Sequence, residues 1–541
     1  MWRCFFLISC GFSGILSNTM QKRPPIIAVM GHVDHGKTTL LDHIRKTAYG
    51  KLTASKGGEP RPVAGREAGG ITQSIGAYEI EVQPKDEPRS RESEANRGIP
   101  RQMPRDDFAG KTHKMTFIDT PGHEAFSKMR AHSAKIADIA ILIVAADDGV
   151  KPQTKNALEY ILKEEIPYVV AINKTDKPEA DVEKTKNDLA QAGVYLEGFG
   201  GNISWHEISA KSGEGVAGLL DLVALATDVE DLTYDPAAPA SGVVLTSKTD
   251  ARRGAVVGVV LTNGTLNTGD FIATVESKGR AKNLSDASGK IVKTATPCAS
   301  LLILGFETLP SVGETFFAGE EKAVLALITS LPAHESVVFE LEAPKDAGYS
   351  LPVIVKAGET GSLEAIRDLL QKLSNDLPLH VVDSGVGDIH ENDVKLSEST
   401  NAVVIGFHVK IDKAAENLAR NQKITVLVSD IIYELEKSLR MHAKKVSPKK
   451  EFPSIEILGV FGVAKGKERV IGGKVVLGPV KNHESFEIWQ GEKMIGVGKI
   501  LNLQSKRQDI AEAETDREVG LLVESAESIK IGNRLIFPQE E

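Results

Sequence analysis

Residues 31 to 38 read Gly-His-Val-Asp-His-Gly-Lys-Thr, and this octapeptide constrains the fold of the chain more than any other feature. Gly31 and Gly36 permit backbone turns that a Cβ would block, so successive N–H groups can converge on a phosphate at a helix N-terminus. Lys37 adds a positive charge for the terminal phosphates, and the Thr38 hydroxyl is placed to bind Mg²⁺. The octapeptide is therefore predicted to be a phosphate-binding loop, to which His32, Val33, Asp34 and His35 also belong.

Both flanks of this loop fit the prediction, since such a loop works only between a strand and a helix. Residues 26 to 30 form a short apolar run typical of a buried parallel strand, and Leu40, Leu41 and Ile44 then recur at helical spacing. The same alternation continues to about residue 229 and predicts a doubly wound, parallel α/β sheet. The expected strands are 26 to 30, 76 to 82, 115 to 119, 139 to 145, 168 to 172 and 205 to 208, and the expected helices are 38 to 46, 153 to 165, 180 to 192 and 215 to 227.

A second nucleotide motif, Asp119-Thr120-Pro121-Gly122, ends one of the predicted strands. The Asp119 carboxylate can hold Mg²⁺ through a water, and the Gly122 N–H can meet a γ-phosphate. The tetrapeptide is common by itself, but it gains weight from the octapeptide before it.

The sequence Asn173-Lys174-Thr175-Asp176 follows another strand, where a base-reading loop belongs in this fold. Asp176 only accepts hydrogen bonds, so it can pair with the two N–H donors of guanine, which adenine lacks. Ser209-Ala210-Lys211 follows the next strand and is expected to support the base through a backbone N–H. The predicted nucleotide is therefore GTP.

Two further residues concern hydrolysis. Thr72 precedes a predicted strand, so its hydroxyl can complete the coordination of Mg²⁺ when a γ-phosphate is present. His123 directly follows Gly122 and is placed to orient the attacking water. No arginine finger is evident, so intrinsic hydrolysis should be slow.

The rest of the chain is expected to form further domains, because 541 residues are too many for one core. The predicted parts are a tail or incorrectly assigned start at 1 to 20, a GTP-binding domain at 21 to 230 with an insertion at 83 to 114, a β-barrel at 235 to 320, an α/β domain at 345 to 428, a connecting helix at 429 to 447 and a second β-barrel at 451 to 541. The two β-rich parts are candidates for a shared architecture.

Composition is that of an ordinary globular protein. Three cysteines, Cys4, Cys10 and Cys298, give neither a disulfide framework nor a metal-ligand pattern, which suits a reducing cytosol. Residues 1 to 19 are apolar but too short to span a bilayer, and Met20 is the better start. The net charge of −9 is not the overall positive charge typical of nucleic-acid-binding proteins, so any contact with RNA must come from local basic patches. The best such patch contains Lys437, Arg440, Lys444, Lys445, Lys449 and Lys450, although such a run is usually a solvated face.

With these residues in hand, the chain resembles bacterial translation initiation factor 2, a ribosome-dependent GTPase related to the archaeal and eukaryotic factor five B. The resemblance runs from about residue 24 to the end, and its third-domain part excludes simple elongation factors as the nearest relatives. It is carried by residues 31 to 39, 67 to 73, 119 to 123, 144 to 149, 152 to 154, 361 to 365, 384 to 387 and 401 to 406.

This resemblance implies GTP-dependent binding of formylmethionyl initiator tRNA by the last barrel, joining of ribosomal subunits, and hydrolysis triggered by the large subunit. It also implies that Val33 and Ile71 form an apolar gate beside His123, and that Asp34 holds a monovalent cation. Ribosomal RNA is an implied partner, other initiation factors are compatible with it, and a cytoplasmic monomer without a membrane partner is expected. The last domain departs from the family pattern, because it reads Gln504-Ser505-Lys506 and Val519-Gly520 where the family has a Lys-Arg-aromatic run and a cysteine before a glycine; Lys506 and Arg507 can substitute after a small shift.

We therefore expect an initiation GTPase in which Lys37, Thr38, Thr72 and Asp119 organise the phosphates and Mg²⁺, and His123 positions water. Two other functions stay open. The chain could be another translational GTPase, such as a specialised carrier of aminoacyl-tRNA, or a GTP-gated ribosome assembly factor whose hydrolysis is incidental.

Overall fold

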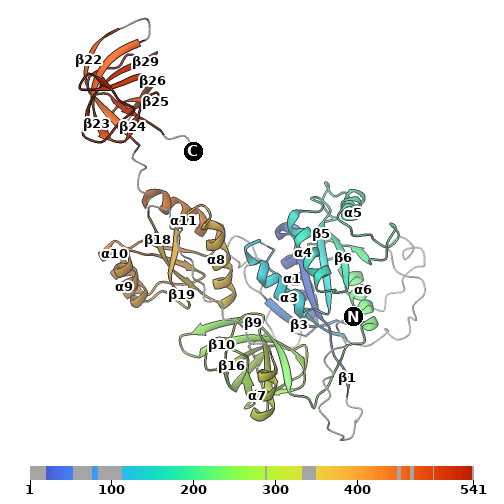
Figure 1. The fold of residues 1–541 in the computed structure, drawn as a ribbon. Helices are drawn as coiled ribbons and strands as arrows, with labels where there is room; N and C mark the ends of the chain where they lie inside the picture. The colour runs from blue at the N-terminus through green and yellow to red at the C-terminus, as the bar shows by residue number, and fades with distance from the viewer. Residues whose placement is uncertain are drawn as a thin grey trace. The chain divides into compact units, whose positions relative to one another are not determined.

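The computed structural model describes residues 20–52, 76–82, 113–122, 124–286, 289–331, 349–446, 452–463, 468–491 and 493–538. The chain divides into two compact units, Met1–Lys445 and Val446–Glu541, and each is described by itself (Figure 1). Ile71, Thr72 and His123 lie outside the described residues, as do residues 1 to 19 and residues 83 to 112 of the predicted insertion. Within the described chain, no helix has both the length and the apolar character needed to cross a membrane.

A six-stranded sheet forms the centre of the first domain, with the order β3-β4-β2-β5-β6-β7. Its strands are β2 (Ile26–Gly31), β3 (Gly76–Val82), β4 (His113–Asp119), β5 (Ile139–Ala145), β6 (Tyr168–Asn173) and β7 (Trp205–Glu207). The predicted strands are thus confirmed, and β4 begins two residues earlier than expected. The predicted parallel sheet is confirmed for five of its strands, and the prediction is wrong for the edge strand β3, which runs antiparallel to β4. Two antiparallel strands such as β3 and β4 can be joined without a crossover helix. This agrees with the sequence of the predicted insertion, 83 to 114, where no helix was predicted.

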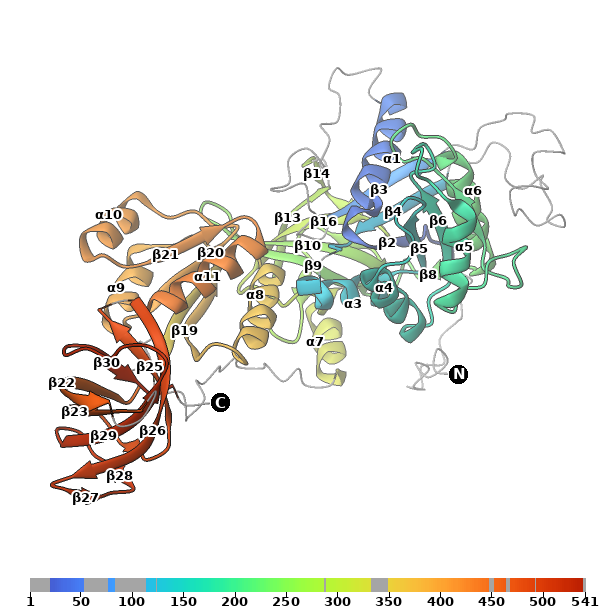
Figure 2. The same cartoon turned by 90° about the horizontal axis from the view of Figure 1, so that it is seen from above.

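Helices cover both faces of this sheet, which confirms the doubly wound arrangement (Figure 2). The helices α1 (Lys37–Leu52) and α6 (Val216–Val229) pack on one face, and α3 (Ser127–Ile136), α4 (Pro152–Lys163) and α5 (Val182–Gln191) pack on the other. Every residue of β5 is buried, as expected for a central parallel strand between two helical layers.

The helix α3 was not predicted from the sequence. Its buried face includes two polar residues, Arg130 and Ser133, which hide the apolar periodicity on which the prediction depends. Both are buried with hydrogen bonds: Arg130 Nη1 donates to the Pro121 carbonyl at 3.1 Å, and Ser133 Oγ donates to the Met129 carbonyl at 2.9 Å. Each of the two side chains thus has a hydrogen bond to a nearby backbone carbonyl, which offsets part of the cost of burying it.

The predicted first barrel is confirmed as a closed ring of six strands, β12-β17-β9-β10-β16-β13. These strands are β9 (Ala240–Asp250), β10 (Gly254–Asn263), β12 (Phe271–Ala273), β13 (Lys278–Asp286), β16 (Ser300–Phe306) and β17 (Thr315–Gly319). The ring closes through the β12–β13 pair, so its six strands leave no open sheet edge between them. A helix that was not predicted, α7 (Glu321–Ser330), follows and packs Val324 on Phe271 and Ala273.

The second unit is also a closed six-stranded barrel, with the ring order β25-β30-β22-β23-β29-β26. Its strands are β22 (Ser454–Val463), β23 (Glu468–Leu477), β25 (Ser485–Gln490), β26 (Lys493–Ser505), β29 (Glu518–Ser525) and β30 (Arg534–Ile536). Numbered along the chain, the strands of both barrels follow the same ring order, 3-6-1-2-5-4. The expected shared architecture is therefore confirmed at the level of strand topology.

In the sequence, the segment between the two barrels forms a parallel four-stranded sheet in the order β19-β18-β20-β21, with helices on both faces. Its strands are β18 (Leu351–Ala357), β19 (Leu379–Val386), β20 (Val403–Phe407) and β21 (Val426–Ser429), and its helices are α8 (Thr360–Leu373), α9 (Glu391–Thr400) and α10 (Lys413–Gln422). The predicted connecting helix is α11 (Ile432–Val446), which starts three residues later than expected because Ser429 still pairs within the sheet.

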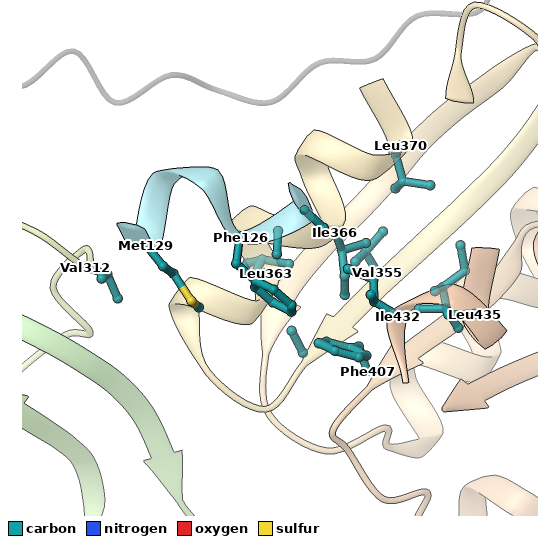
Figure 3. Close-up of a cluster of buried hydrophobic side chains, with 14 of the residues drawn as sticks. Phe126, Met129, Val312, Val355, Leu363, Ile366, Leu370, Phe407, Ile432 and Leu435 are labelled. Carbon is teal, nitrogen blue, oxygen red and sulfur yellow. The ribbon is translucent and has the colours of Figure 1, made fainter. Parts of the chain in front are cut away.

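One buried apolar cluster crosses the domain boundaries of the first unit (Figure 3). Phe126 and Met129, which follow the Asp119 motif, pack with Leu363 and Ile366 of α8, and Val312 of the first barrel joins them. The cluster continues through Phe407 to the buried face of α11, which carries Ile432, Leu435 and Leu439. The segment after the predicted nucleotide loop is therefore part of the same core as α8 and α11.

Candidate nucleotide-binding site

The predicted phosphate loop lies at the carboxyl end of β2, where it bends sharply before α1 begins at Lys37. Gly31 and Gly36 have φ values of 147° and 89°. A Cβ on Gly31 would lie 2.4 Å from the Ile143 carbonyl oxygen, and one on Gly36 would lie 2.4 Å from Asn173 Nδ2. Both positions therefore require glycine for two reasons, backbone conformation and space.

Lys37 is buried inside this loop. Its Nζ donates to the Gly31 carbonyl at 3.0 Å and to the His32 carbonyl at 2.7 Å. Burial lowers the pKa of the Lys37 ammonium to about 8, and the nearby Asp119 carboxylate opposes this shift. The loop thus holds a desolvated cation, a group for which an anion is a favourable neighbour.

Asp119 ends β4 and faces the start of α1, where Thr38 Oγ1 lies 3.4 Å from Asp119 Oδ2. Two hard oxygen donors at this spacing are the type of ligand that Mg²⁺ prefers. Gly122 lies against the loop, because a Cβ there would be 2.6 Å from Lys37 Nζ and 2.9 Å from Val33 N. The residues of the two phosphate motifs are therefore brought together.

The side chain of Thr120 forms a hydrogen bond within the protein. Its hydroxyl donates to the Val29 carbonyl at 2.7 Å and fixes the Asp119 segment to β2. Pro121 accepts the Arg130 bond from α3, which fixes the same segment from the other side. Of the loop residues, Asp34 is exposed and Val33 is half-buried.

Asn173 ties the phosphate loop to the predicted base-binding loops. It is buried, its Nδ2 donates to the His35 carbonyl at 2.7 Å, and its Oδ1 accepts from the Ala210 N–H at 2.9 Å. Both functional groups of the amide are thus bonded within the protein. This residue positions two loops, a role that the motif alone did not reveal.

Asp176 lies beside Ser209 at the end of the next strand. The buried Ser209 hydroxyl donates to Asp176 Oδ1 at 2.7 Å, and this hydrogen bond lowers the pKa of the Asp176 carboxyl. The carboxylate is exposed and ionised, with Lys211 exposed nearby in the chain. An ionised carboxylate held by one hydroxyl keeps other lone pairs for a ligand with N–H donors.

Two residues outside the predicted set also shape the site. Gln153 Oε1, at the start of α4, accepts the Val33 N–H of the phosphate loop at 3.2 Å. Asp147 Oδ2 lies 3.4 Å from Lys174 Nζ and 2.6 Å from Lys177 Nζ, so it holds the base loop from β5. The only sequence signal at Gln153 is the family resemblance of residues 152 to 154, and no local pattern predicts these contacts.

His35 is buried beneath the loop. Burial, with a smaller contribution from the neighbouring His32, lowers the pKa of His35 to about 4. Its Nδ1 lies 3.4 Å from the Ile143 carbonyl oxygen, and its ring meets that of His32 edge-on at 5.0 Å. The neutral imidazole is therefore a structural part of the loop.

Three protein-family models match successive parts of the chain. The model of the elongation factor Tu GTP binding domain matches residues 22–228, that of elongation factor G domain 2 matches 239–319, and that of translation-initiation factor 2 matches 334–440. Translation initiation factor IF-2 of Thermotoga petrophila is 35% identical over 535 residues, which cover 95% of this chain and 71% of the relative. The chain belongs to the translation initiation factor IF-2 family.

Other members of the IF-2 family are similarly related. The chloroplastic factor of Rhodomonas salina is 35% identical over 94% of this chain, and this chain spans 64% of the length of that relative. The chain spans 58% of the length of the factor from Bartonella quintana. Among solved structures, GDP-bound aIF5B from Aeropyrum pernix is 26% identical, covers 96% of this chain and 92% of its own, and has a TM-score of 0.47.

The last barrel contains the two segments, 504 to 506 and 519 to 520, in which the sequence is expected to depart from the family pattern. Lys506 and Arg507 occupy the tight turn between β26 and β27 (Gln508–Asp509), both with positive φ and both exposed. Gly520 pairs with Gln504 across β29 and β26, so these two segments are neighbours on one sheet. Two exposed cations, Lys506 and Arg507, therefore lie at the end of β26, next to these paired segments.

We expect Asn173→Ala to lower the free energy of unfolding of the nucleotide-free chain by about 3 kcal/mol, because it leaves two buried backbone groups without their hydrogen-bond partner. Urea unfolding without nucleotide measures this. Asp176→Ala, at an exposed position of the same loop, should change it by less than about 1 kcal/mol. Equal stabilities of the two variants would contradict the positioning role.

The stability of the chain should also depend on pH through His35. The pKa is about 4 in the folded chain and 6.5 when unfolded. Between these values the unfolded chain binds more protons, so stability is lost as the pH falls from 6.5 towards 4. We expect wild type to lose about 2 kcal/mol more than His35→Gln between pH 7 and pH 5. Parallel pH dependences of the two urea midpoints would contradict this assignment.

Proposed function

We propose that this chain is a translation initiation GTPase that binds GTP at the loop of residues 31 to 38 and hydrolyses it on the ribosome. The observation that carries the proposal is the buried Asn173 amide, which joins the phosphate loop to the Asp176 and Ser209 loops at one edge of the sheet. This arrangement supports simultaneous contact with the phosphates and the base of one nucleotide.

In this proposal the phosphates lie against the backbone of residues 31 to 36 and the Lys37 ammonium, and against residues 119 to 122. Thr38, Asp119 through a water, and Thr72 would hold Mg²⁺, which suits oxygen ligands and would neutralise phosphate charge when bound. Asp176 would accept the guanine N–H groups, with Asn173, Lys174, Ser209, Ala210 and Lys211 forming the base site.

Hydrolysis would depend on His123, which we propose as the residue that orients water, with Val33 and Ile71 as an apolar gate. Asp34 is exposed beside the loop and would be available to a monovalent cation. Near the loop, the described part of the chain offers Arg130, but this guanidinium is buried and donates to the Pro121 carbonyl. The positive charge that completes catalysis would therefore come from the ribosome.

The remaining domains give this GTPase its purpose in the proposal. The barrel at 451 to 541 would bind formylmethionyl initiator tRNA. The domains at 235 to 320 and 345 to 428 would connect this barrel to the nucleotide-binding domain at 21 to 230. GTP hydrolysis would accompany the joining of the ribosomal subunits. Ribosomal RNA, both subunits and other initiation factors are the proposed partners of a monomeric, cytoplasmic chain.

The guanine and ribosome assignments can be tested in one experiment. Wild type should hydrolyse GTP with strong stimulation by ribosomes, whereas Asp176→Asn should lose GTP use and gain XTP use, because the amide donates where the carboxylate accepted. His123→Ala should bind GTP but lose the ribosome-stimulated rate. Retained GTP preference in Asp176→Asn would remove the base assignment, and an unchanged rate in His123→Ala would remove the catalytic one.

Binding of tRNA tests the proposed purpose separately. With GTP present, the full chain should bind formylated initiator tRNA more tightly than its unformylated form or an elongator tRNA. A double variant, Lys506→Ala with Arg507→Ala, should weaken all three by about tenfold, since these cations would contact phosphates. Equal affinity of wild type for the three tRNAs would favour a general carrier or an assembly factor, provided that GTP hydrolysis is intact.

A further inference from the structure

A groove of about 760 Å³ lies within the first unit, between the nucleotide-binding domain, α8 and α11. Its walls include Ser127 and Gln153 of the first domain, Lys372 and Asn375 at the end of α8, and Tyr433 and Arg440 of α11. We call it the junction groove. Because Gln153 also accepts the Val33 N–H, the groove ends one hydrogen bond away from the phosphate loop.

The exposed face of α11 extends this groove. Tyr433, Lys437, Met441 and Lys444 recur at helical spacing on the side opposite the buried Ile432, Leu435 and Leu439, and Tyr433 and Met441 are 51% and 52% exposed. A second hollow, of about 320 Å³, follows this stripe. Tyr433, Glu436 and Arg440 line both hollows, so the two hollows adjoin each other.

The unpaired charge on this surface is positive. Arg440 pairs with Glu436 and with Asp376, each at 3.0 Å, and Asp368 of the groove pairs with Lys128 at 2.8 Å. The carboxylates along the groove are therefore already in ion pairs. Lys437 and Lys444 are exposed and form no ion pair with any residue that the structure describes.

We propose that the junction groove and the α11 stripe bind a strand of RNA, with Lys437 and Lys444 on its phosphates and Tyr433 stacked under a base. Unpaired lysines beside an exposed aromatic ring, with amide side chains in the groove, match the combination that single-stranded nucleic acid requires. An acidic protein segment would use the lysines but gain little from the ring. This assignment rests on the proposed function, which makes RNA the expected class of partner. It places the RNA on a surface of the first unit, outside the last barrel.

The test measures binding of a fluorescent, short, mixed-sequence RNA to the full chain by anisotropy over a range of salt concentrations. Lys437→Ala with Lys444→Ala should weaken binding about tenfold and reduce the slope of log affinity against log salt by about 1.4, since each phosphate contact contributes about 0.7. Tyr433→Ala should weaken it about tenfold with an unchanged slope.

The matched control is Lys155→Ala with Lys163→Ala, which removes two exposed lysines from α4 of the same unit and should leave RNA affinity unchanged. Equal affinities of the two double variants would overturn the proposal. So would displacement of the labelled RNA by polyglutamate as efficient as that by unlabelled RNA, which would assign the surface to an acidic protein. GTP binding, measured in parallel, should be normal in all variants, so failure here is distinct from failure of the GTPase assignment.

Discussion

The candidate site depends on one buried amide. Asn173 donates to the His35 carbonyl and accepts from the Ala210 N–H, and so holds three loops that arrive from different strands in a single arrangement. A buried amide with both groups satisfied favours one geometry, because each alternative leaves a polar group without a partner. The phosphate loop is also fixed from below by the neutral His35 ring and from the side by Gln153.

The second constraint is the apolar cluster around Phe126 and Leu363. It places the segment that follows Asp119 and Gly122 in the same core as α8 and α11, so a change in that segment must be accommodated by two helices outside the nucleotide-binding domain. Close-packed interiors tend to change between discrete arrangements, since small shifts leave voids or overlaps. The junction groove lies beside this cluster, where an occupant would contact both the first domain and α11.

The sequence predicted a large part of the first domain because its signals are local. Continuous apolar runs gave the strands at 26 to 30 and 139 to 145, and two glycines with a lysine gave the loop. It failed where the deciding interactions are distant in the chain. The helix α3 has a polar buried face whose bonds go partly to Pro121, and the antiparallel direction of β3 depends on its pairing with β4. The contacts of Gln153 and Asp147 join segments 120 and 30 residues apart, respectively.

By itself, the sequence determined which groups are available: a loop that needs glycine at 31 and 36, a cation, a hydroxyl, and carboxylates at 119 and 176. Backbone sterics and side-chain chemistry depend on the residue itself, so these properties can be predicted from one amino-acid sequence. Only the tertiary structure decided that Asn173 positions loops and that Thr120 bonds to β2. It also decided that, among the described residues, Lys437 and Lys444 of α11 have no carboxylate partner. These contacts join residues that are far apart in the sequence. They depend on how the segments pack together, which local sequence patterns do not predict.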